Sequence, residues 1–92
     1  MSTPSDKCPW SKQQIRTARR IHLKPLLERK GMTFHETGGD NYRVREYPGL
    51  VIRYHYWHWF DYDKKGNTID FFTMVLGLTF ADAMREIEAL SH

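Results

Sequence analysis

The sequence predicts an α+β domain in which a small antiparallel sheet is flanked by N-terminal and C-terminal helices. Helix-cap signals near both ends of the chain precede apolar residues at helical spacing. In the middle of the chain the apolar period changes to two, and Gly and Pro residues separate short segments as turns separate strands. The 92 residues suit one domain with one modest core. We expect residues 1–10 to form a flexible N-terminal lead and residues 11–92 a single domain.

The first helix is predicted by a capping box. Ser11 is followed three residues later by Gln14, and Trp10 stands in front of the cap. The pattern predicts a helix from Lys12 to about Ile21. The residues expected on its inner face are Ile15, Ala18 and His22.

A second, short helix is expected over Lys24–Lys30. Pro25 suits a first helical turn, because its missing N–H would have no helical partner there. Gly31 is typical of a helix end. The residues expected to face inward are Leu23, Leu26 and Leu27.

The middle of the chain has the two-residue period of strands. Residues 32–37 and 42–46 lie on either side of the turn residues Gly38–Asn41, which predicts a hairpin. After Pro48 and Gly49, residues 50–60 are rich in β-branched and aromatic types and are too long for one average strand. We therefore expect a tight turn within Arg53–Tyr56.

The C-terminal part is predicted to be helical after a charged loop at Asp61–Gly66. Asn67 with Asp70 three residues later is a cap signature, and Gly77 ends the helix that this cap opens. Thr79 caps a final helix. The residues expected to face inward are Ile69, Phe71, Phe72 and Val75, followed by Phe80, Ala83, Ile87 and Leu90.

The charge is uneven along the chain. The whole sequence carries a net +3, whereas residues 1–30 alone hold eight Lys and Arg against two acids, a net +6. This asymmetry fits an anionic partner and fits a solvated basic helix face equally well.

Cysteine content and hydropathy indicate the compartment. Cys8 is the single cysteine, so the sequence allows neither an intramolecular disulfide nor a multi-thiolate zinc site. No apolar run approaches the roughly 20 residues of a membrane span, and the first residues lack the apolar core of a signal peptide. We expect a cytoplasmic protein with no membrane partner and no cofactor.

Residues 57–72 (WHWFDYDKKGNTIDFF) and 77–90 (GLTFADAMREIEAL) resemble the CHC-type zinc-binding domain of bacterial DNA primases. The matching residues are His58, Phe60, Lys64, Gly66, Ile69, Asp70, Phe71, Gly77, Leu78, Phe80 and Ala83. Upstream, residues 11–31 look like the helical lead of a zinc-less subgroup, found in primase-like, Toprim-associated proteins of plasmids and other mobile elements. The resemblance implies a module that binds single-stranded template across its sheet.

The positions of the family's zinc ligands differ in this chain. Trp59 and Tyr62 replace two family cysteines, and the other ligand pair falls near Arg45–Pro48, where there is neither Cys nor His. The resemblance therefore implies a zinc-ribbon-like sheet that has lost its metal. Structural zinc contributes on the order of 10 kcal/mol to folding in zinc-finger peptides. We expect Trp59 and Tyr62, with Trp57 and Tyr47, to fill the vacated space in the core.

The predicted nucleic-acid interface combines cations with stacking rings, as single-strand binding requires. Arg43 and Arg45 share one strand face by alternation, and Lys64 and Lys65 precede a helix start. The complete predicted set is Arg43, Arg45, Arg53, Tyr54, His55, Tyr56, Trp57, Lys64 and Lys65. Two structural explanations stay open: a solvated strand face for the two arginines, and a simple connection for the lysines.

The predicted function is binding of single-stranded DNA as a non-catalytic module of a primase-like replication protein. No carboxylate pair or nucleophile–base set is placed by a recognisable turn, so we expect no catalysis by this chain alone. The alternative is an adaptor that docks a primase catalytic domain, a helicase or a relaxase through its aromatic hairpin, without touching DNA.

Overall fold

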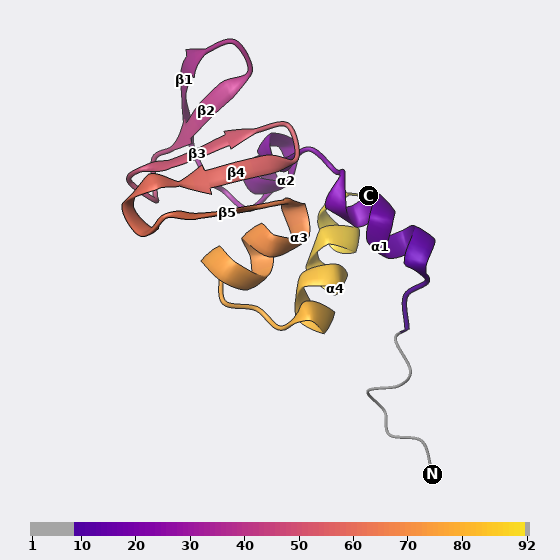
Figure 1. Cartoon of the computed structure of the whole chain (residues 1–92). Coiled ribbons are helices and arrows are strands. Elements are labelled where there is room, and N and C mark those ends of the chain that lie inside the picture. Colours follow the sequence, from indigo (N-terminus) through magenta and orange to yellow (C-terminus); the bar gives the residue numbers. More distant parts are fainter. Residues whose placement is uncertain (1–8, 92) are drawn as a thin grey trace.

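The structure, a computed structural model, describes residues 9–91. Five antiparallel strands form one sheet in the order β1-β2-β3-β4-β5, with helices before and after it (Figure 1). The predicted α+β class is therefore confirmed. The elements are α1 (Lys12–Arg19), α2 (Leu23–Arg29), β1 (Phe34–Gly38), β2 (Asn41–Val44), β3 (Leu50–Arg53), β4 (Tyr56–Trp59), the 3₁₀ turn η2 (Phe60–Tyr62), β5 (Lys64–Gly66), α3 (Thr68–Asp70), the π-helical segment η3 (Phe71–Val75) and α4 (Phe80–Leu90).

The sheet is a meander in which each strand pairs with the next one along the chain. The turn expected within Arg53–Tyr56 is confirmed, because these two residues pair and leave Tyr54 and His55 as the turn. The expected loop at Asp61–Gly66 is wrong in its second half, since Lys64–Gly66 forms β5 and pairs with β4. Asp63 has a positive φ of 50°, which lets the chain reverse directly into that strand.

Polar caps set the helix starts as the sequence predicts. At α1, the Gln14 N–H donates to the Ser11 hydroxyl over 3.1 Å, and the Ser11 N–H donates to the Gln14 side chain over 2.7 Å. Asn67 and Asp70 make the same reciprocal pair at α3, with both distances 3.1 Å. The first helix ends at Arg19, two residues before the expected end.

Packing begins at Trp10, the residue in front of the α1 cap. Its indole is 9% exposed, meets the Phe80 ring edge-on with centroids 6.0 Å apart, and donates a hydrogen bond to the Glu88 carboxylate. Residues 1–8, with Cys8 and most of the predicted lead, lie outside the described residues. No helix within residues 9–91 has the length and apolar composition that a membrane crossing requires.

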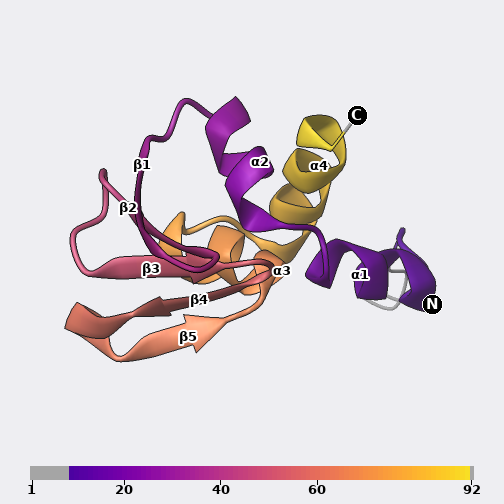
Figure 2. The ribbon, with the colours of Figure 1, turned by 90° about the horizontal axis from the view of Figure 1, so that it is seen from above.

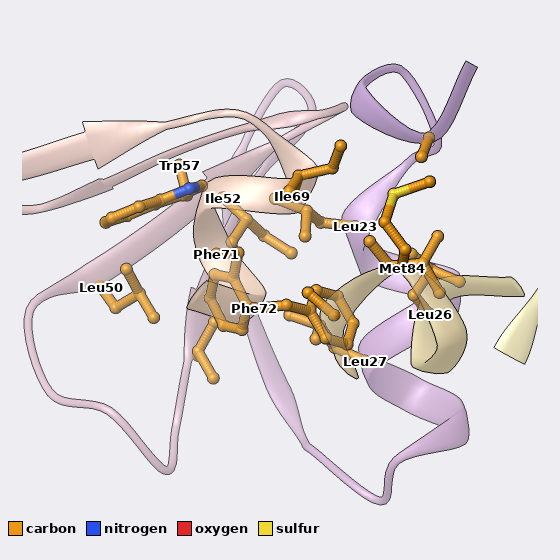
Figure 3. Close-up of a cluster of buried hydrophobic side chains, with 14 of the residues drawn as sticks. Leu23, Leu26, Leu27, Leu50, Ile52, Trp57, Ile69, Phe71, Phe72 and Met84 are labelled. Carbon is orange, nitrogen blue, oxygen red and sulfur yellow. The ribbon is translucent and has the colours of Figure 1, made fainter. Parts of the chain in front are cut away.

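The core lies between one face of the sheet and the helices. Figure 3 shows sheet residues such as Ile52 and Trp57 beside Phe71 and Phe72 of the π-helical segment. α2 and α4 contact each other and lie side by side next to the sheet (Figure 2). Buried residues are Leu23, Leu26, Leu27, Val44, Leu50, Ile52, Trp57, Ile69, Phe71, Phe72, Ala83, Met84 and Ile87. Two residues expected to face inward do not do so: His22 is exposed, and so is much of Phe80.

Candidate nucleic-acid interface

The face of the sheet opposite the core carries a row of basic and imidazole side chains. Strand register places His35 opposite Arg43, Arg43 opposite Val51, Val51 opposite His58, and His58 opposite Lys65. Directly opposed residues in an antiparallel pair lie on the same face. The row therefore crosses all five strands.

A second, shorter row runs beside the first. Arg53 pairs with Asn41 on one side and with Tyr56 on the other. We call the residues of the two rows the open face: His35, Asn41, Arg43, Val51, Arg53, Tyr56, His58 and Lys65. None of these strand residues is acidic. At the rim of this face, the Asp63 Oδ1 lies 4.0 Å from the His58 Nε2.

Aromatic rings follow β4 along the open face. Tyr56 and His58 alternate with the core-facing Trp57, and Phe60 continues the series at the start of η2. The Phe60 ring stacks on His58 with centroids 4.0 Å apart and planes 29° apart. Tyr56 is 59% exposed and Phe60 is 61% exposed. We call Tyr56, His58 and Phe60 the aromatic ladder; every second residue of a strand recurs after about 7 Å.

Tyr54 is anchored in the β3–β4 turn. Its φ is 54°, a conformation that costs a non-glycine residue about 1–2 kcal/mol. Its hydroxyl donates to the Asp40 carboxylate, a bond that raises the pKa of the phenol, and its carbonyl accepts the Leu23 N–H at 2.8 Å. The Arg53 guanidinium lies 5.4 Å from the ring centroid. These contacts hold the turn, and with it Arg53, at the end of the open face.

The structure brings only part of the predicted interface together. Arg43, Arg53, Tyr56 and Lys65 share the open face, while His55 is half-buried in the turn with its ring 4.1 Å from that of Tyr56. Arg45 is exposed but lies one residue beyond β2.

Two predicted interface residues are placed elsewhere. Trp57 is 3% exposed, packs edge-on against Phe71 and donates its indole N–H to the Asn67 carbonyl at 2.8 Å. The expectation that Trp57 fills the core is confirmed, and its assignment to the interface is wrong, because a ring buried in the core has no face for a base. Lys64 pairs with Trp59 and so belongs to the opposite face from Lys65.

Three aromatic residues meet where the resemblance places the zinc ligands. Trp59 is half-buried, donates its indole N–H to the Pro48 carbonyl at 3.0 Å, and contacts Tyr47 and Tyr62 with ring centroids 5.6 and 4.5 Å away. Tyr62 is 62% exposed, so its assignment to the core is wrong: the η2 turn carries it out of the sheet. Indole and phenol groups do not fit a zinc site, which needs thiolate, imidazole or carboxylate ligands. Among residues 9–91, no three His, Cys, Asp or Glu side chains are grouped to hold a metal ion.

The sequence prediction missed Phe60, His58 and His35 as members of the interface. For Phe60 and His58, the two-residue alternation of the strand was the available signal. It places Tyr56, His58 and Phe60 on one side and Trp57 and Trp59 on the other. The position of His35 depends on pairing between strands, and only the structure supplies that register.

No family model matches the chain, and no curated protein or solved structure matches it either. The resemblance to the CHC-type primase domain therefore stays a prediction from the sequence.

Proposed function

We propose that the chain binds single-stranded DNA across the open face and acts as a non-catalytic module of a primase-like replication protein. The observation that carries the proposal is the coincidence of three cations, Arg43, Arg53 and Lys65, with an exposed aromatic ladder. They share a sheet face that no helix of residues 9–91 covers. Proteins that bind single strands combine these two features: a positively charged track for the backbone and rings for the bases.

The cations and the rings of the open face have different roles in the proposed binding. Arg43, Arg53 and Lys65 are placed to neutralise phosphates, because they surround the ladder and no open-face residue opposes them in charge. Tyr56 and Phe60 each present an outer ring face to solvent, as their exposure shows. A ring at this position stacks on any base, which makes the predicted binding tolerant of sequence.

The same arrangement favours a single strand over a duplex. Bases in a duplex are already stacked on one another, so their faces are closed to protein rings, whereas unpaired bases can splay onto a sheet. A duplex would contact only the cations. We therefore expect the duplex to bind more weakly and to gain nothing from the ladder.

The sequence resemblance and the aromatic cluster support this assignment. The contact among Tyr47, Trp59 and Tyr62 joins the two segments that carry zinc ligands in the primase domain. Each such aromatic pair contributes about 0.5–1.5 kcal/mol beyond the area it buries. A cluster of this kind is a reasonable replacement for part of the stabilisation that a metal would give.

Fluorescence anisotropy tests the proposal. Labelled oligo-dT and a duplex of equal length are titrated at low and moderate salt, with and without added zinc. Three phosphate contacts on a single strand give a slope of about −2 in a plot of log affinity against log salt. Preference for the single strand, that slope, and indifference to zinc are the expected results; no binding at low salt contradicts the proposal.

The alternative is a protein-interaction adaptor for a primase, helicase or relaxase. One observation favours it. Tyr56, Phe60 and Tyr62 are 59%, 61% and 62% exposed, and large exposed rings are enriched at protein interfaces. An interface centred on such rings should change little with salt, whereas phosphate contacts weaken steeply. The salt titration therefore distinguishes the two functions.

A further inference from the structure

A pocket opens at one end of the open face, where β5 leads into α3. Its volume is about 500 Å³, within the range of about 300–1,000 Å³ of typical ligand sites. All three members of the aromatic ladder line it, together with the cations Arg53 and Lys65. The polar lining also includes Asn41 of the open face, and Asn67 and Asp70 from outside that face.

Asn67 and Asp70 are fixed in the pocket by their own cap. The Asp70 Oδ2 accepts the Asn67 N–H, and the Asn67 Oδ1 accepts the Asp70 N–H, both at 3.1 Å. Trp57 also donates to the Asn67 carbonyl at 2.8 Å. The cap uses one carboxylate oxygen of Asp70 and the amide oxygen of Asn67. The Asp70 Oδ1 remains as an acceptor and the Asn67 Nδ2 as a donor.

Gly66 lets the Asp70 carboxylate lie against the edge of β5. A Cβ at residue 66 would stand 2.5 Å from the Asp70 Oδ2 and 2.6 Å from its Cβ, closer than real atoms approach. Any side chain there would displace the carboxylate. The position of the Asp70 carboxylate at this end of the sheet therefore requires glycine at residue 66.

A pocket with rings, cations and one fixed carboxylate suits a nucleobase with its phosphate. The rings take the face of the base and the cations its phosphate. A carboxylate accepts hydrogen bonds from an exocyclic amino group, as it does from cytosine N4. In thymine, the only ring N–H lies between two carbonyl oxygens, which a carboxylate repels.

We propose that this pocket holds one base of the bound strand and that Asp70 selects a base with an exocyclic amino group, with cytosine favoured over thymine. The inference rests on the proposed function, since it concerns one base of the strand that crosses the open face. It adds a base preference to a surface that otherwise binds without regard to sequence.

The test compares three oligonucleotides of about eight nucleotides, a length within the usual range for a single-strand site. They contain thymine, cytosine, or 2-pyrimidinone, which is cytosine without its amino group. Wild-type protein should bind oligo-dC on the order of 10-fold tighter than oligo-dT, since a good base contact discriminates by roughly 5-fold to 150-fold. The 2-pyrimidinone strand should bind like oligo-dT.

Variants locate the preference. Asp70→Asn keeps the shape and a cap acceptor, and it should bind oligo-dC and oligo-dT with equal affinity. Asp82→Asn is the matched control, because Asp82 also follows a helix cap by three residues, at Thr79, and lies outside the pocket. It should keep the wild-type preference. Thermal unfolding checks that each variant is folded.

The outcomes separate this inference from the proposed function. Equal binding of oligo-dC and oligo-dT by the wild type overturns the base preference and leaves single-strand binding intact. Failure of every strand to bind at low salt overturns both. If Asp70→Asn does not fold, the 2-pyrimidinone strand decides: when it binds wild-type protein as tightly as oligo-dC, the amino group is not read.

Discussion

Tyr56 and Trp57 are neighbours in β4 and have opposite surroundings. Tyr56 is 59% exposed and Trp57 is 3% exposed. The core-facing rings of this strand are bound in place: Trp57 donates to Asn67 and Trp59 to Pro48. The open-face rings lie beside imidazoles, His55 for Tyr56 and His58 for Phe60.

The difference shows that one aromatic run has two uses. Alternation sends every second ring into the core, where area burial stabilises the fold. The intervening rings remain on a cationic surface, and clustered exposed apolar groups of this kind mark binding sites. Substitutions on the two sides of β4 should therefore separate stability from binding.

The largest effect is expected on the core side. Trp57→Ala should reduce the free energy of unfolding by about 3–5 kcal/mol, because it leaves a cavity next to Phe71 and removes the hydrogen bond to Asn67. Urea unfolding followed by circular dichroism measures this loss. A variant that keeps wild-type stability but loses DNA binding would show that Trp57 belongs to the interface.

On the open side, Phe60→Ala should weaken binding of oligo-dT by about 1–3 kcal/mol, the contribution of one base stacked on a ring. Tyr62→Ala is the matched control: its ring is equally exposed, at 62% against 61%, but packs on Trp59. Anisotropy titrations compare the two. Equal losses of affinity would mean that the ladder has no special part in binding.

The two lysines of β5 offer a finer test, since they are adjacent and face opposite ways. Lys65→Ala should lower affinity a few-fold and reduce the salt slope by about 0.7, the change for one single-strand phosphate. Lys64→Ala should leave both unchanged. If the two variants behave alike, the phosphate contacts are not restricted to the open face.

The smallest effect concerns stability at the start of β1. Thr33 donates its N–H and its hydroxyl to the Glu46 carboxylate, and these bonds lower the pKa of Glu46 below its ordinary 4.5. The stabilisation that these bonds give the fold is therefore complete above the ordinary pKa of Glu46. It is lost as the pH falls through the lower pKa that Glu46 has in the folded protein. Glu46→Gln should melt slightly below wild type at neutral pH, and the gap should close as the pH falls below the folded pKa of Glu46. A gap that persists in acid contradicts this assignment.

Much of the fold could be predicted because local signals carry it. Ser11, Asn67 and Thr79 each form the cap that the sequence indicates, and Leu23, Leu26 and Leu27 are buried as expected. These features depend on residues within a few positions of one another, so one sequence is enough to find them.

The remainder depends on pairing between distant residues. Lys64–Gly66 has no strand propensity and becomes β5 only because β4 offers hydrogen bonds beside it. Period-two alternation separates Trp57 from Tyr56, but it does not say which side the helices cover. The sequence interpretation therefore named Trp57 both as a core residue and as part of the interface, and it placed Tyr62 in the core. The structure confirms Trp57 in the core and corrects the other two assignments.

DNA that binds as proposed lies on the open face, and an NMR titration locates it residue by residue. Amide chemical shifts of ¹⁵N-labelled protein are followed while oligo-dT is added at low salt. The shifted residues should gather on β2 to β5 around Arg43, His58 and Lys65, with α4 unaffected. Shifts centred on the helices, or none at all, would contradict it.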